Sequence, residues 1–150
     1  GNEIIYVIEE RAAHRPPLVS GVGVRLPSHL TATGRAILSA LPRNQVRALY
    51  PNRQAFTDRT GIGPKSPKEL EATLAETQRT GFAEERGDVT PGFDSYAVAV
   101  RDYNDFPIAG LALTFVSGSL RPEQERSLKT KLRLAGTELS RRLGAVGSLT

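Results

Sequence analysis

The sequence predicts an α+β fold in which an antiparallel sheet carries helices on its faces. Residues 94–102 alternate, with Tyr96, Val98 and Val100 on one side and small residues on the other. The nearly all-apolar run 108–116 follows after a short turn, as expected for the neighbouring antiparallel strand. Two well-capped helical segments lie elsewhere in the chain. We therefore expect five or six antiparallel strands with helices packed on them.

Three more strands are expected from the N-terminal region and the middle of the chain. Residues 3–9 are rich in β-branched and aromatic side chains, and residues 18–25 form a second such run with two glycines in it. The segment 11–17 ends in two prolines and connects these runs. Residues 82–86 form a further short strand.

The first two predicted helices follow the strand over residues 18–25. The first begins after Thr31, whose side chain is a suitable N-cap, and it stops at Leu41 because Pro42 cannot continue a helix. A short second helix follows, packed through Val46 and Leu49.

The third helix has the clearest boundaries in the sequence. Ser66 is the N-cap of a helix that runs to about Thr80, and Gly81 supplies the left-handed residue that ends it. The last helix runs from Pro122 to Gly144. Its apolar residues recur at spacings of four and three along one face, namely Leu128, Leu132, Ala135, Leu139 and Leu143.

The first turn of the first helix consists of unusually small residues for a surface helix, Ala32, Thr33 and Gly34 before Arg35. A helix start presents unpaired N–H groups that can receive a carboxylate or phosphate. Small residues also permit a helix to pack closely on a sheet, so a binding role and a packing role both stay open. The small-residue strand face that includes Ser95 has the same two interpretations.

Composition indicates a globular chain without a metal or cofactor site. The 150 residues suit one domain, and they contain no apolar run long enough to span a membrane. There is no cysteine and there are only two histidines, which argues against a zinc site and fits a cytoplasmic protein. The net charge is +4, but basic and acidic residues are interleaved and no nucleic-acid-binding motif is visible.

Residues 23–39 read GVRLPSHLTATGRAILS and resemble the G-x-R-x-P-x-H-x-T-A-x-G-K/R-A-x-L-A signature of the effector-binding domain of IclR-type transcriptional regulators. Residues 56–60, FTDRT, resemble the family's F-T-x-x-T motif. Residues 81–100 resemble its G-Y-A-x-D-x-x-E-x-x-x-G-V-x-S-I-A-A-P-V segment, with Asp88 in place of the family's frequent Glu and Val98-Ala99 in place of Ala-Pro.

The resemblance implies that residues 1–150 form an effector-binding domain with a curved antiparallel sheet of about six strands, related to profilin-like and GAF-like sensors. It implies a homodimer or homotetramer that contacts DNA only through a winged helix-turn-helix domain outside this chain. The effector would be a small organic acid or aromatic metabolite, bound without a cofactor. The residues expected to line its pocket, under the 87–92 loop, are Ala32, Thr33, Gly34, Glu85, Phe93 and Ser95. We expect Gly34→Leu to fill this pocket, abolish effector binding and leave the fold largely intact.

Two alternatives are weighed against sensing. An enzyme could use Ser28 with His29, or Glu84 with Glu85, but neighbouring residues on an extended segment project to opposite sides. His29 is more simply interpreted as a hydrogen-bonded structural residue. A pure oligomerisation module, based on the long last helix and the apolar strands, is the other alternative and is compatible with sensing.

Overall fold

The computed structural model describes residues 1–14, 18 and 21–147. Its centre is an antiparallel sheet with the order β3-β4-β5, formed by β3 (Ala83–Arg86), β4 (Phe93–Arg101) and β5 (Pro107–Val116). A separate two-stranded antiparallel ribbon joins β1 (Glu3–Ile5) to β2 (Arg25–Pro27). The predicted α+β class and antiparallel pairing are confirmed.

The strand count differs from the expectation of one sheet with about six strands, because the described residues contain five strands in two sheets. The predicted strand over 18–25 is wrong for its described part, although positions 19–20 lie outside the described residues. Gly23 adopts a left-handed φ of +87° in a turn, and the strand begins only at Arg25. The predicted strand over 3–9 also ends early, at Ile5.

The predicted helices are present with nearly the predicted ends. They are α1 (Ala32–Ala40), α2 (Arg43–Leu49), α3 (Pro67–Thr80) and α4 (Pro122–Arg142), with a short 3-10 turn η1 (Arg53–Ala55). Thr31 Oγ1 accepts from Gly34 N at 2.9 Å and Ser66 Oγ from Glu69 N at 3.2 Å, so both predicted N-caps are formed. Gly81 ends α3 with a φ of +80°.

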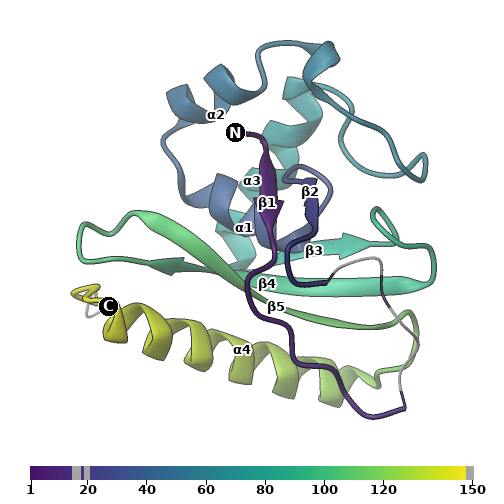
Figure 1. Cartoon of the computed structure of the whole chain (residues 1–150), viewed down its shortest axis with the longest axis vertical. Helices are drawn as coiled ribbons and strands as arrows, with labels where there is room; N and C mark the ends of the chain where they lie inside the picture. Colours follow the sequence, from purple (N-terminus) through teal and green to yellow (C-terminus); the bar gives the residue numbers. More distant parts are fainter. Residues whose placement is uncertain (15–17, 19–20, 148–150) are drawn as a thin grey trace.

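The two faces of the central sheet differ in the size of their side chains. One face is built from alanines that pack against α1, and we call it the alanine face: its buried or partly buried members are Ala83, Ala97, Ala99 and Ala112. The other face carries Tyr96 and Val98 and packs against Leu132 of α4. Figure 1 shows this arrangement, with α4 along one side of the sheet and α1, α3 and the β1–β2 ribbon on the other.

In its second half, helix α4 buries residues other than the leucines predicted to face the sheet. Leu132 is buried as expected, but Leu139 and Leu143 are 38% and 42% exposed. The buried position after Leu132 is Gly136, where an added Cβ would lie 2.6 Å from Val98 Cγ2. The helix therefore approaches the sheet through a glycine that a search for leucine spacing overlooks.

Candidate functional site

A row of three polar side chains crosses the alanine face from strand to strand. Glu85 of β3 pairs in register with Ser95 of β4, which pairs with Thr114 of β5. Ser95 Oγ donates to Glu85 Oε1 at 3.1 Å and lies 2.9 Å from Thr114 Oγ1. Because the Ser95 hydroxyl has only one hydrogen, Thr114 is the donor in the second bond. We call these three residues the polar row.

The polar row runs from the interior to solvent. Glu85 and Ser95 are only 5% and 7% exposed, whereas Thr114 at the β5 end is an exposed residue. Phe93 lies two residues before Ser95 on the same face of β4 and is half-buried. Burial of an ionisable group on this largely apolar face is costly, and the hydroxyls of Ser95 and Thr114 connect the Glu85 carboxyl group to solvent.

Burial is the main cause that raises the pKa of Glu85 above its usual range, and the neighbouring Asp88 carboxylate acts in the same direction. Hydrogen bonds from Asp88 N, at 2.9 Å, and from Ser95 act against this rise, as does the charge of Arg35. Because burial prevails, the site favours the neutral carboxylic acid more than a surface glutamate does. A neutral Glu85 can donate a hydrogen bond to an anion.

The start of α1 lies directly over the sheet near the polar row. A Cβ added to Gly110 of β5 would lie 2.7 Å from Thr33 Cγ2 and 3.3 Å from Thr33 O, so this contact requires glycine. The pKa of Tyr6 is raised by burial and, to a smaller extent, by the Glu85 carboxylate. Thr33 therefore contacts β5 at Gly110, four residues from Thr114, and Tyr6 lies within electrostatic reach of Glu85.

Two predicted site residues serve the packing of the fold. Ala32 is 2% exposed and packs in the alanine cluster between α1 and the sheet. A Cβ on Gly34 would lie 2.2 Å from Ser28 O and 2.4 Å from Ser28 Cα, so the group close to this glycine is the chain's own backbone. The expectation that Gly34→Leu leaves the fold intact is therefore wrong.

Helix α1 nevertheless keeps free donors at its start. Gly34 N donates to the Thr31 hydroxyl and Arg35 N to the Thr31 carbonyl. The amides of Ala32 and Thr33 precede the first intrahelical acceptor, and no acceptor for them occurs among the described residues. Of the six predicted site residues, Thr33, Glu85, Phe93 and Ser95 thus offer side chains at this end of the sheet, whereas Ala32 offers its amide.

The 87–92 loop is attached to α1 by a buried arginine. Arg35 Nη2 forms an ion pair with Asp88, and both side chains are almost fully buried. Arg35 also donates from Nε to His29 O at 2.8 Å and from Nη1 to Glu84 O at 2.7 Å. Asp88 Oδ1 accepts from Arg86 N at 3.0 Å. We call the Arg35–Asp88 pair with these bonds the arginine clamp.

The family description "Bacterial transcriptional regulator IclR C-terminal" matches residues 1–141 of this chain. The chain belongs to the IclR family. A curated relative is the HTH-type transcriptional regulator XynR of Escherichia coli K12, which is 28% identical over 144 residues, covering 96% of this chain and 57% of the relative. The resemblance seen in the sequence is thereby confirmed.

Solved structures of the IclR family agree with the fold. The Agobacterium tumefaciens repressor BlcR superposes with a TM-score of 0.81 at 29% identity, over 98% of this chain and 58% of that one. The inducer-binding domain of Acinetobacter PobR, a double mutant in complex with 3-hydroxybenzoic acid, superposes with a TM-score of 0.70 at 22% identity, over 86% of this chain and 74% of that one. This chain spans somewhat more than half the length of XynR and BlcR.

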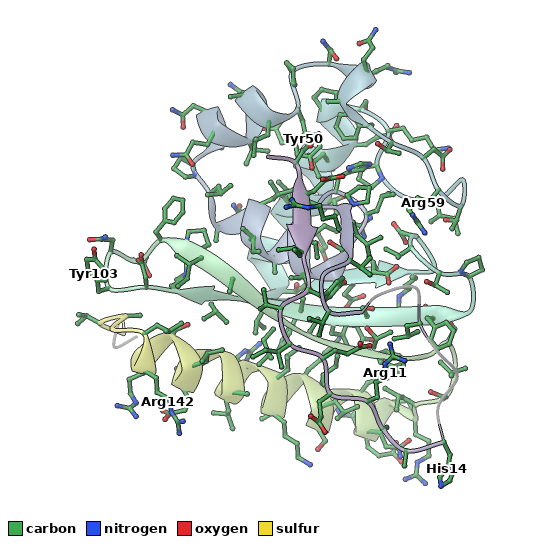
Figure 2. The ribbon with its side chains drawn as sticks, in the orientation of Figure 1. Arg11, His14, Tyr50, Arg59, Tyr103 and Arg142 are labelled. Carbon is green, nitrogen blue, oxygen red and sulfur yellow. The ribbon has the colours of Figure 1, made fainter. Side chains whose placement is uncertain are left out.

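The residue pairs considered for catalysis are engaged elsewhere in this IclR-family fold. His29 Nε2 donates to Thr57 O at 2.8 Å, and the ring packs edge-on against Tyr50 and Phe56. Burial lowers the pKa of His29, consistent with a neutral structural histidine. Ser28 is buried, and Tyr50, whose ring packs against His29, is a buried side chain that Figure 2 places in the upper layer. XynR and BlcR are named as a regulator and a repressor, not as enzymes.

The adjacent acids Glu84 and Glu85 point to opposite faces of β3, as expected from strand geometry. Glu84 Oε1 accepts from Lys129 Nζ of α4 at 2.9 Å, whereas Glu85 lies on the face that α1 covers. Sequence reasoning missed Thr114, Tyr6 and Gly110. Only Gly110 carries a signal, because a glycine inside an apolar strand indicates a close backbone approach.

Proposed function

We propose that this chain is the small-molecule sensing domain of an IclR-type bacterial transcriptional regulator, with the polar row as the core of its effector site. The observation that carries the proposal is the hydrogen-bonded series Thr114, Ser95 and Glu85, which leads from an exposed hydroxyl to a buried acid of raised pKa. Perturbed ionisable groups linked to solvent are typical of binding sites.

The chemistry of the region favours a small organic acid or an aromatic metabolite. A ligand carboxylate would accept hydrogen bonds from a protonated Glu85 and from the α1 amides of Ala32 and Thr33. The Thr114 hydroxyl would join them by turning its one hydrogen from Ser95 Oγ to the ligand. Phe93 offers an apolar wall for the rest of the molecule. The 3-hydroxybenzoic acid in the PobR complex belongs to this chemical class, which supports the choice of probes.

The regulatory part of the proposal concerns coupling to DNA. Effector binding would change the balance between conformations of a cytoplasmic homodimer or homotetramer, whose DNA contacts are made by a winged helix-turn-helix domain outside these residues. The arginine clamp joins the 87–92 loop to α1, so a ligand beside the polar row would act on both. Within the described residues, no helix combines the length and apolar character needed to cross a bilayer.

A thermal-shift panel tests the sensing proposal. We expect at least one of benzoate, 3-hydroxybenzoate and acetate to raise the melting temperature. A ligand at 100 times its Kd adds about 2.7 kcal/mol, which corresponds to roughly 5–10 °C for a chain of this size. Thr114→Val should reduce the shift and Thr114→Ser should retain it, because serine keeps the hydroxyl.

The exposed Thr130 of α4 provides a matched control, since Thr130→Val removes a hydroxyl that bonds only its own helix. Its shift should equal that of the unmodified chain. A panel without any shift, or a shift that Thr114→Val leaves unchanged, would count against the polar row as the effector site.

A further inference from the structure

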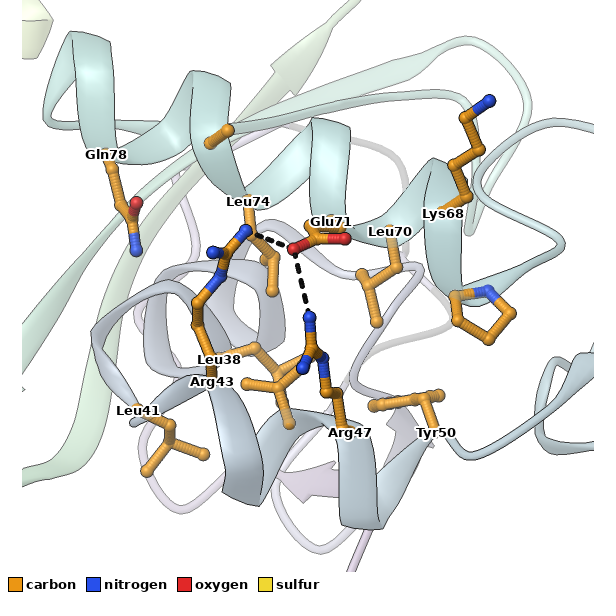
Figure 3. Close-up of a pocket in the computed structure, with 13 residues that line it drawn as sticks. Leu38, Leu41, Arg43, Arg47, Tyr50, Lys68, Leu70, Glu71, Leu74 and Gln78 are labelled. Carbon is orange, nitrogen blue, oxygen red and sulfur yellow. Dashed lines mark hydrogen bonds and ion pairs between the residues drawn. The ribbon is translucent and has the colours of Figure 1, made fainter.

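A cavity lies between α1, α2 and α3, away from the polar row. Its volume is about 260 Å³. The walls include the buried side chains of Leu38, Tyr50, Leu70 and Leu74. Helix α2 covers one side of it without burying any of its own residues. We call this cavity the helical groove, and Figure 3 shows its leucines pointing into the space between the helices.

Two arginines stand at the mouth of the helical groove. Arg43 and Arg47 lie one turn apart on α2, and their side chains are 76% and 72% exposed. Both approach the same oxygen of Glu71 on α3: Arg43 Nη2 is hydrogen-bonded to Glu71 Oε1, and Arg47 Nη2 lies 3.9 Å from it. Figure 3 shows both arginines converging on this carboxylate across the groove.

The charges at the mouth favour an anion. Glu71 is the one carboxylate among the residues that line the described groove, and it faces two guanidinium groups. Its side chain is 48% exposed, so it can turn into water when another carboxylate takes its place. Glu71 therefore marks the position in which an incoming carboxylate would meet both arginines.

We propose that the helical groove binds an amphipathic monocarboxylate, with its apolar body among the leucines and its carboxylate between Arg43 and Arg47. The size fits this class, because a cavity of roughly 150 Å³ lined by aliphatic side chains holds benzene. The groove has room for a phenyl ring or medium alkyl chain with a short acidic end. This site is separate from the proposed effector site, since Leu38 and Thr33 lie at opposite ends of α1.

The test is a titration of the ¹⁵N-labelled chain with octanoate, followed by NMR. We expect saturable shifts of the amides of Leu38, Val46, Leu70 and Leu74, and none with octylammonium, which has the same apolar chain and the opposite charge. Thr114→Val should leave this titration unchanged, which separates it from the test of the polar row.

Two variants move the affinity in opposite directions. Arg47→Gln should weaken octanoate binding by roughly two- to five-fold, the range for one exposed ion pair. Glu71→Gln should tighten binding by a similar factor, because it removes the carboxylate that competes for the arginines. Arg126→Gln, an exposed arginine of α4, is the matched control and should leave the Kd unchanged.

The proposal is overturned if octanoate gives no saturable shifts in the groove. It is equally overturned if octylammonium binds as well as octanoate, or if Arg47→Gln and Glu71→Gln leave the Kd unchanged. The side chains of Arg43, Arg47 and Glu71 are all substantially exposed. Without octanoate, the spectra of the variants should therefore match that of the unmodified chain.

Discussion

Removal of the arginine clamp by Arg35→Met should destabilise the fold severely. Methionine has a similar length but no charge, so the substitution removes the ionic partner of Asp88. The Asp88 carboxylate then stays buried with Arg86 N as its remaining backbone donor. It also removes the donors to His29 O and Glu84 O. Breaking a buried ion pair by deleting one partner costs about 3–5 kcal/mol. Because a whole domain is stable by about 5–15 kcal/mol, this is a large fraction of the total.

Urea unfolding followed by circular dichroism measures this loss. The stability of Arg35→Lys should lie between those of the unmodified chain and Arg35→Met. A lysine ammonium group can pair with Asp88, but it cannot reach all three acceptors that the guanidinium group binds. Arg79→Met, at an exposed ion pair with Glu76, is the matched control and should leave the urea midpoint unchanged. A loss below about 1 kcal/mol for Arg35→Met would refute the clamp, since that is the range of a surface pair.

Three further predictions follow from single contacts. Gly34→Ala should destabilise the fold by about 3 kcal/mol or more in urea unfolding, because its Cβ would lie 2.2 Å from Ser28 O; a loss below about 1 kcal/mol would show that the α1 entry can move. Ser66→Ala should cost about 1 kcal/mol through loss of the N-cap bond to Glu69 N, and Ser66→Asp should restore most of it. Glu85→Gln should reduce the loss of stability between pH 5 and 8. The pKa of Glu85 is raised in the folded chain, so Glu85 opposes folding increasingly as the pH rises above 4.5, the ordinary pKa of a glutamate. Glutamine does not titrate and should lack this effect. Equal pH profiles for the two chains would contradict this last expectation.

The features that sequence reasoning predicted correctly depend on neighbouring residues. Thr31 and Ser66 cap helices through bonds to residues three positions later, and the alternation of 94–102 determines which side chains share a face. These interactions are local, so their pattern can be recognised before the chain is folded. The helices and β3–β5 were predicted for this reason.

The features that were missed depend on which distant segments meet. Arg35 and Asp88 are 53 positions apart, and Thr114 joins the polar row only through the register between β4 and β5. Gly34 illustrates the same limit, because its small size permits either a ligand or a neighbouring backbone. Only the placement of Ser28 decides that the backbone occupies the space. The prediction of a strand over 18–25 was wrong because Gly23 forms a turn that interrupts this apolar run.

The pH dependence of effector binding tests the role of the polar row most directly. The Kd of 3-hydroxybenzoate, or of whichever panel acid gives the largest thermal shift, would be measured by calorimetry between pH 5 and 8. If a protonated Glu85 donates to the ligand carboxylate, the Kd should rise with pH, approaching tenfold per unit above the pKa of Glu85, and Glu85→Gln should remove that slope. A Kd that is constant over this range in the unmodified chain, or a slope that Glu85→Gln retains, would contradict the account.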